Sequence, residues 1–197
     1  MSPVQRVTQH DAHAYVLDSL GSRIVAGDLA AGRVLTLAGL EEEYQVSRTV
    51  IREVVRVLES HGMVVSRRRV GVTVQPIASW DVFDASVIGW RLAGPGSERQ
   101  LAELMELRSA VEPVAARLAA ERASPEQRQR LAELAAALES LGRRGLGDSD
   151  ESRDADIAYH SLLFQASGNP MLAQLAGPVA SAIEAAGRRQ PAERSPL

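Results

Sequence analysis

Residues 46–64, VSRTVIREVVRVLESHGMV, decide the fold of the first part of this chain. Their apolar residues recur at three- and four-residue steps, which predicts an amphipathic helix. Ser47 is a natural N-cap, and Val46 before it can pack as a hydrophobic staple. Gly62 follows the last periodic residue and suits a C-terminal cap. The core-facing side of the helix is then formed by Ile51, Val54, Val55 and Leu58.

Three arginines lie on the opposite face of the same helix. Arg48, Arg52 and Arg56 are four residues apart and therefore form one stripe. Most charged stripes of this kind are simply solvated helix faces. A short predicted helix over 37–44 and a turn at 45–46 add the spacing of a helix-turn-helix, whose second helix enters the DNA major groove. The sequence therefore favours DNA binding over a merely solvated face.

A predicted β-hairpin follows the arginine helix. Residues 63–67 and 72–75 are rich in β-branched residues, and the segment between them is basic and contains a glycine. A helix-turn-helix followed by such a hairpin is a winged helix. Its wing would place a basic tip against phosphates or in the adjacent minor groove. The expected contact residues of the wing are Arg67, Arg68, Arg69 and Gly71.

Positive charge is concentrated in this part of the chain. Residues 44–76 carry six arginines and two glutamates, whereas residues 77–197 are acidic and the whole chain has a net charge of −3. A cationic segment in an acidic chain indicates an anionic partner such as nucleic acid. The absence of cysteine excludes disulfides and thiolate metal sites. No apolar run approaches a membrane span and no signal-peptide pattern is present, so we expect a cytoplasmic protein without a membrane partner.

The remaining chain is predicted to be mainly α. We expect a winged helix-turn-helix DNA-binding domain over residues 1–76, a connector over 77–98 and an all-α bundle over 99–197. Residues 1–8 and 188–197 are expected to be disordered. The expected helices span residues 10–26, 80–92, 97–123 with a kink or break at Pro113, 124–141, 151–167 and 169–187.

One arginine interrupts the apolar stripe of the first helix of the bundle. Arg108 occupies a position where an apolar residue is expected. A buried arginine is costly unless a partner neutralises it. Arg108 could therefore pair with an internal carboxylate, or bind the carboxylate of a small ligand in a bundle cavity. The stripe itself consists of Leu101, Leu104, Val111, Ala115 and Leu118.

Asp156 and His160 lie four residues apart and therefore share one face of the predicted helix over 151–167. A carboxylate and an imidazole one turn apart can hold a divalent metal ion, or form a hydrogen-bonded pair without one. The other histidines lie in the DNA-binding part, so no third ligand can be named. The sequence also lacks the common metalloprotease, phosphate-loop and nucleophile motifs, so we do not expect an enzyme. A metal-dependent enzyme or carrier built on these two residues is a remote alternative.

The chain resembles the GntR family of bacterial transcription regulators, in its FadR-like branch with a helical FCD-type effector domain. The connector ASWDVFDASVIGW over 78–90 further resembles that of galactonate-operon repressors and related sugar-acid regulators. The segments that carry the family resemblance are GDLAAGRVL (27–35), VSRTVIREVVRVLESHGMV (46–64), SRRRVGVTV (66–74), ELRSAVEPVAARLAAERAS (106–124) and DADIAYHSLLFQASGNP (154–170).

The resemblance implies a homodimer that binds a palindromic double-stranded DNA operator, with one recognition helix per half-site. It also implies a small carboxylate effector, contacted by Arg108. In many members an Asp-x-x-x-His pair, here Asp156 and His160, holds a divalent ion of the Zn, Ni or Mn class together with two later histidines. The family's DNA contacts fall on Arg48, Thr49, Arg52 and, in the wing, Gly71.

This sequence departs from the family pattern in two places. Many members have an acid–arginine pair before the turn, where this chain has Leu-Ala-Gly at 37–39, so that DNA contact is not expected. The family's last helices, with the two remaining histidines, are absent, so we expect a truncated bundle and an incomplete metal site. The predicted function is a transcriptional regulator, and most simply a repressor, controlled by a sugar acid such as galactonate or gluconate. The alternative is a DNA-binding protein without an effector response, because its sensing bundle is incomplete.

Overall fold

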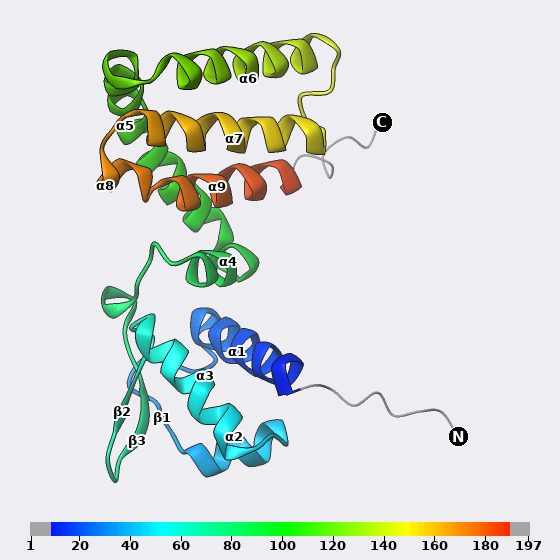
Figure 1. Cartoon of the computed structure of the whole chain (residues 1–197). Helices are drawn as coiled ribbons and strands as arrows, with labels where there is room; N and C mark the ends of the chain where they lie inside the picture. Colours follow the sequence, from blue (N-terminus) through cyan, green and yellow to red (C-terminus); the bar gives the residue numbers. More distant parts are fainter. Residues whose placement is uncertain (1–8, 190–197) are drawn as a thin grey trace, which may run out of the picture. The chain divides into compact units, whose positions relative to one another are not determined.

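The computed structural model describes residues 9–189 and consists of two compact units, the first ending at Ser97 and the second beginning at Glu98 (Figure 1). It confirms the expected fold class, since a winged helix-turn-helix is followed by helices alone. The expected disorder of residues 1–8 and 190–197 lies outside the described residues. Among the described residues, no helix combines the length and apolar character needed to cross a lipid bilayer.

The first unit contains the expected helix-turn-helix. Helix α1 (Gln9–Ala26) is followed by α2 (Leu37–Tyr44) and by the recognition helix α3 (Arg48–Ser60). The turn between α2 and α3 depends on Gln45, which has a left-handed backbone with φ 52°. Ser47 caps α3, because its hydroxyl accepts a hydrogen bond from a backbone N–H of the first turn. These local signals fix where the recognition helix begins.

Gly62 ends the recognition helix, as its sequence position predicted. The N–H of Met63 donates to the carbonyl of Leu58, and the N–H of Gly62 donates to that of Glu59. This pair of hydrogen bonds is a Schellman motif, in which the residue after the cap takes a left-handed conformation. Gly62 does so with φ 69°. The motif turns the chain directly from α3 into the wing.

Replacing Gly62 with alanine is expected to lower the free energy of unfolding by more than about 2 kcal/mol. An added Cβ would lie 2.1 Å from the backbone oxygen of Ser79, which cannot rotate away. Gly27→Ala is the matched control, because Gly27 has φ 85° but nothing within 4 Å of an added Cβ. Urea unfolding of both variants separates the clash from the backbone penalty. Equal destabilisation by the two substitutions would show that the contact with Ser79 is unimportant.

The wing belongs to a small antiparallel sheet. Strands β2 (Val64–Arg67) and β3 (Gly71–Val74) form the predicted hairpin, with Arg67 opposite Gly71. A short strand β1 (Val34–Leu35), which the sequence did not predict, pairs with β3 on its other side. The sheet order is therefore β1-β3-β2, which leaves β2 at an edge.

The connector is part of the first unit. Its helix α4 is Ala85–Ala93, so our expectation that a helix begins at residue 80 was wrong. Asp84 explains the late start, because its carboxylate accepts hydrogen bonds from the N–H groups of Ser86 and Val87 and caps the helix. A 3₁₀ turn, Ile77–Ser79, occupies part of the preceding segment. Helix α4 then packs on α1 and contributes Val87 and Trp90 to the same buried core as α3.

The second unit is a helical bundle. Its long helices α5 (Ser97–Arg122), α6 (Pro125–Arg143) and α7 (Asp150–Ala166) agree closely with the predicted segments. Figure 1 shows α7 running between α6 and α9 (Ala176–Arg189). The small side chains of α5 pack against α7 and α9 around the fully buried Phe164.

Two proline predictions in this unit need correction. Of the kink or break expected at Pro113, the break was wrong, because helix α5 continues through this proline. The helix expected over 169–187 is instead divided into α8 (Pro170–Ala173) and α9. Pro178 explains the division, because a proline lacks the N–H that would continue the first helix and is tolerated within the first turn of a new one. Helix α9 also extends to Arg189, two residues into the segment expected to be disordered.

Candidate functional site

The arginine face of α3 is exposed to solvent. The apolar side of the helix is buried, with Ile51 and Val54 both at 0% exposure. The side chains of Arg48 and Arg56 are 69% and 62% exposed, and Arg52 is also exposed. The apolar and arginine side chains of α3 therefore lie on opposite faces of the helix, as the helical period predicted.

Two of these arginines have acidic neighbours. Arg56 pairs with Glu53 at 2.6 Å, and the Nε atom of Arg48 lies 3.9 Å from the carboxylate of Glu41. Arg52 makes no ion pair within the described part of the chain. Exposed ion pairs contribute only about 0–1 kcal/mol, so the acids do not prevent these arginines from binding a stronger anionic partner.

The tip of the wing presents further arginines. Arg67, Arg68 and Arg69 are exposed, and none of them forms an ion pair within residues 9–189. The tip is a tight turn in which the N–H of Val70 donates to the carbonyl of Arg67 at 3.1 Å. Gly71 follows with φ 118°, and an added Cβ there would lie 2.6 Å from a backbone oxygen of β1. A side chain at Gly71 would therefore separate the wing from the rest of the sheet.

A recess of about 470 Å³ lies between α3 and the wing. Arg52 and Arg56 line it from the helix, and Arg68 lines it from the wing. The structure therefore brings together arginines that the sequence placed in two separate motifs. Thr49 is exposed at the start of α3, and Arg67, Arg69 and Gly71 do not line the recess. The other residues of the lining are Leu37, Val55, Glu59 and Ser66.

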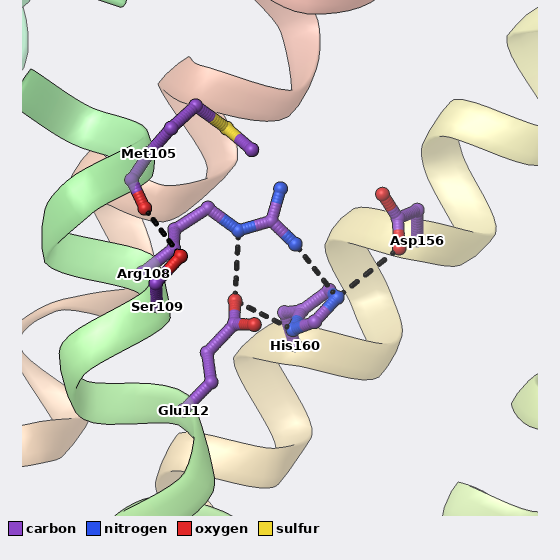
Figure 2. A network of polar contacts seen from close by, with 6 residues as sticks. All are labelled: Met105, Arg108, Ser109, Glu112, Asp156 and His160. Atoms are coloured by element: carbon purple, nitrogen blue, oxygen red, sulfur yellow. Dashed lines mark hydrogen bonds and ion pairs between the residues drawn. The ribbon is translucent and has the colours of Figure 1, made fainter. Parts of the chain in front are cut away.

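A second candidate site is a polar cluster inside the helical bundle (Figure 2). The Arg108 side chain is only 15% exposed, and its Nε atom donates to a carboxylate oxygen of Glu112 at 2.8 Å. Its Nη2 atom lies 3.0 Å from Nε2 of His160. Of the two alternatives left open for Arg108, pairing with an internal carboxylate is therefore observed. Sequence reasoning did not name Glu112, although its position one helical turn after Arg108 was the available signal.

His160 connects the two sides of this cluster. Its Nε2 atom lies 3.2 Å from a carboxylate oxygen of Asp156, as their shared helix face predicted. Its Nδ1 atom lies 3.0 Å from Glu112, but without the alignment of a hydrogen bond, so this buried nitrogen has no hydrogen-bond partner. The two carboxylates therefore approach opposite nitrogens of one ring.

This arrangement does not fit a divalent metal ion. A metal binds one imidazole nitrogen together with other ligands on the same side, whereas Glu112 and Asp156 lie at different nitrogens of His160. The guanidinium of Arg108 already lies beside Nε2 and would repel a second cation there. Within residues 9–189, no group of three or more histidine or acidic side chains could hold a metal ion.

A pocket of about 410 Å³ opens beside the cluster. Arg108 and Asp156 line it, together with Asp148, Ser152 and Arg153. Arg153 was not identified from the sequence, although it lies three residues before Asp156 and hence on the same side of α7. One of its nitrogens donates to the carbonyl of Asp148 at 2.8 Å. The pocket therefore combines two guanidinium groups with two carboxylates, which can hold an anion that also carries hydrogen-bond donors.

Comparison with known proteins identifies a known domain in each half of the chain. Residues 13–74 match the model of the gntR family of bacterial regulatory proteins, and residues 103–197 match the FCD domain. The chain is 35% identical to the galactonate operon transcriptional repressor of Escherichia coli (strain K12) over 167 residues, which cover 84% of this chain and 71% of that protein. It is 30% identical over 181 residues to the uncharacterised HTH-type transcriptional regulator YieP of the same organism, covering 89% and 76% of the two chains.

A solved structure supports the same fold. The structure of Lar, which controls expression of the Listeria monocytogenes agr system, aligns with a TM-score of 0.51 at 19% identity, over 88% of this chain and 72% of that one. The matching families and relatives are transcription regulators rather than enzymes, which confirms the expectation that this chain is not an enzyme. The chain belongs to the GntR family of DNA-binding transcription regulators and combines the family's DNA-binding domain with an FCD domain.

Proposed function

We propose that this regulator acts as a repressor that binds a palindromic operator as a homodimer and responds to a small carboxylate metabolite. The observation that carries the proposal is the arginine-lined recess between α3 and the wing. A recognition helix in the major groove and a wing beside it would bring these cations to neighbouring parts of one duplex. The name of the E. coli relative supports a repressing role.

The DNA contacts follow from the exposed surfaces of α3 and the wing. Arg48, Thr49, Arg52 and Arg56 lie on one exposed side of the recognition helix, which enters the major groove. Arg52 is the proposed base-reading residue, because an arginine can donate two hydrogen bonds to one guanine. In the wing, Arg67, Arg68 and Arg69 contact phosphates or the minor groove, and Gly71 lets the backbone approach closely.

The effector pocket is the cavity beside Arg108 in the helical bundle. Arg108 and Arg153 would bind the carboxylate of the effector, while Asp148 and Asp156 would accept hydrogen bonds from its hydroxyl groups. This combination suits a sugar acid such as galactonate or gluconate, and the name of the E. coli relative points in the same direction. The effector would act by binding more tightly to the arrangement of the dimer that cannot hold both half-sites.

The metal ion expected at Asp156 and His160 has no part in the proposed function. FCD domains often bind a metal, but the described residues of this chain place the guanidinium of Arg108 at the imidazole nitrogen facing Asp156. Arg108 instead supplies the positive charge of the site. An anion entering the pocket would then compete with Glu112 for that guanidinium.

A regulator without an effector response is the second candidate function. It is favoured by the fact that Arg108 already has two partners, Glu112 and His160, and thus needs no ligand to neutralise it. The two candidates share the same DNA-binding surface. They differ only in whether a sugar acid changes operator affinity.

Selection of duplexes from a random library tests the operator proposal directly. The purified chain is expected to enrich a two-fold symmetric sequence, and sedimentation is expected to show two chains per duplex. Hydroxyl-radical footprinting should then show protection of both half-sites. Enrichment of an asymmetric sequence bound by one chain would contradict the homodimer, and no enrichment of any sequence would contradict operator binding itself.

A further inference from the structure

Glu59 joins the recognition helix to the wing. It lies in the last turn of α3, and one oxygen of its carboxylate accepts a hydrogen bond from the backbone N–H of Ser66 in β2 at 2.5 Å. Strand β2 is the edge of the sheet, where backbone N–H groups lack a neighbouring strand. A side chain of α3 therefore takes the place of a neighbouring strand, and it holds β2 one residue before Arg67 and the turn of the wing.

The position of this carboxylate is electrostatically unfavourable for DNA binding. Glu59 lines the same recess as Arg52, Arg56 and Arg68, and it is the sole acidic residue of that lining. A negative charge there lowers the potential that attracts phosphates. Glu59 is therefore a poor candidate for a contact residue, whereas its bond to Ser66 gives it a structural effect on the recess.

We propose that Glu59 is a positioning residue for DNA recognition: it fixes the wing relative to α3, so that Arg68 lies at the recess already lined by Arg52 and Arg56. This inference rests on the proposed operator binding. A fixed wing meets the duplex without first losing conformational freedom, and the entropic cost of binding is correspondingly smaller. Without the bond, the hairpin can pivot on its edge strand, and Arg68 loses its defined place.

Three substitutions separate the bond from the charge. Glu59→Ala removes both, whereas Glu59→Gln removes the charge but keeps an oxygen that can accept from Ser66. Glu59→Asp keeps the charge but is one methylene too short. Glu53→Ala is the matched control, because Glu53 lies on the same helix and pairs only with Arg56 at the surface. Thermal melting of each variant establishes that it is folded before binding is measured.

The test is a double-mutant cycle with Arg68→Ala, measured by fluorescence anisotropy on the selected operator. Arg68→Ala is first introduced into three proteins in which the wing is held in place: the wild type, Glu59→Gln and Glu53→Ala. In each of them it is expected to weaken operator binding roughly tenfold. It should also reduce the slope of log K against log salt concentration by about 0.9 for each phosphate that is no longer neutralised. In the Glu59→Ala and Glu59→Asp proteins, Arg68→Ala is expected to change neither the operator affinity nor the salt slope, because a displaced Arg68 does not reach its phosphate.

Each outcome of the cycle is informative. An equal effect of Arg68→Ala in all backgrounds would overturn the role of Glu59 while leaving operator binding intact. The same conclusion would follow from the Glu59→Asp and Glu59→Gln proteins alone, should the alanine variant fail to fold. If the wild-type protein binds no duplex, the proposed function fails and the inference fails with it. The proposal is supported if Arg68→Ala weakens operator binding in the Glu59→Gln protein, as in the wild type, but not in the Glu59→Asp protein.

Discussion

Replacing Arg52 with alanine is expected to weaken binding of the selected operator by about 1–3 kcal/mol and to relax specificity at one base pair of each half-site. Arg52 lies at the centre of the exposed stripe of α3 and lines the recess beside the wing. Within the described residues it has no ion pair, whereas Arg48 and Arg56 have acidic neighbours. Its guanidinium is therefore the most available of the stripe for a base edge.

The measurement is fluorescence anisotropy with the operator and with duplexes changed at single base pairs. Arg128→Ala is the matched control, because it removes an exposed arginine of α6 and hence the same charge from the other unit. Arg52→Ala should reduce the difference between the operator and one particular changed duplex, while Arg128→Ala should leave all affinities nearly unaltered. Unchanged affinity of the Arg52→Ala protein would contradict its assignment as a base-reading residue.

Replacing Arg108 with alanine is expected to abolish the effector response while leaving operator binding in place. The Arg108 guanidinium lies between Glu112 and His160 and lines the pocket, so its removal leaves a carboxylate without its counter-charge where the effector anion should bind. Loss of one partner of such a buried charge pair costs about 2–5 kcal/mol of affinity. This corresponds to a loss of effector binding of at least roughly thirtyfold.

Calorimetry with galactonate and gluconate, together with release of the labelled operator, measures this effect. Arg99→Ala is the control, because Arg99 is a highly exposed arginine of the same helix α5. Arg108→Lys should respond only weakly, since an ammonium group cannot bind a carboxylate through two parallel hydrogen bonds. A full response in the Arg108→Ala protein would contradict the assignment. No response in the wild type would instead favour the regulator without an effector.

Local sequence signals were sufficient to predict the exposed arginine face of α3. Ser47 and Gly62 fix the two ends of α3 through hydrogen bonds within a few residues of themselves. The separation of apolar and arginine positions then follows from the helical period alone. The expected exposure of Arg48, Arg52 and Arg56 is therefore confirmed, because it required no knowledge of distant contacts.

Features that depend on distant contacts could not be predicted. Strand β1 has two residues and exists because β3 lies beside it, so no periodic pattern marks it. The hydrogen bond between Glu59 and Ser66 requires the chain to turn back on itself after α3. The approach of His160 to Arg108 joins residues of α5 and α7, for which the sequence offered only an interrupted stripe.

The salt dependence of operator binding tests the central claim most directly, namely that the arginines of α3 and the wing bind the phosphates and bases of one duplex. Each neutralised phosphate contributes about 0.9 to the slope of log K against log salt concentration. We predict a slope magnitude of about 4 or more for the wild-type protein, and a much smaller one when Arg48, Arg52 and Arg56 are all replaced with alanine. A slope near zero, or one that the triple substitution leaves unchanged, would contradict this account.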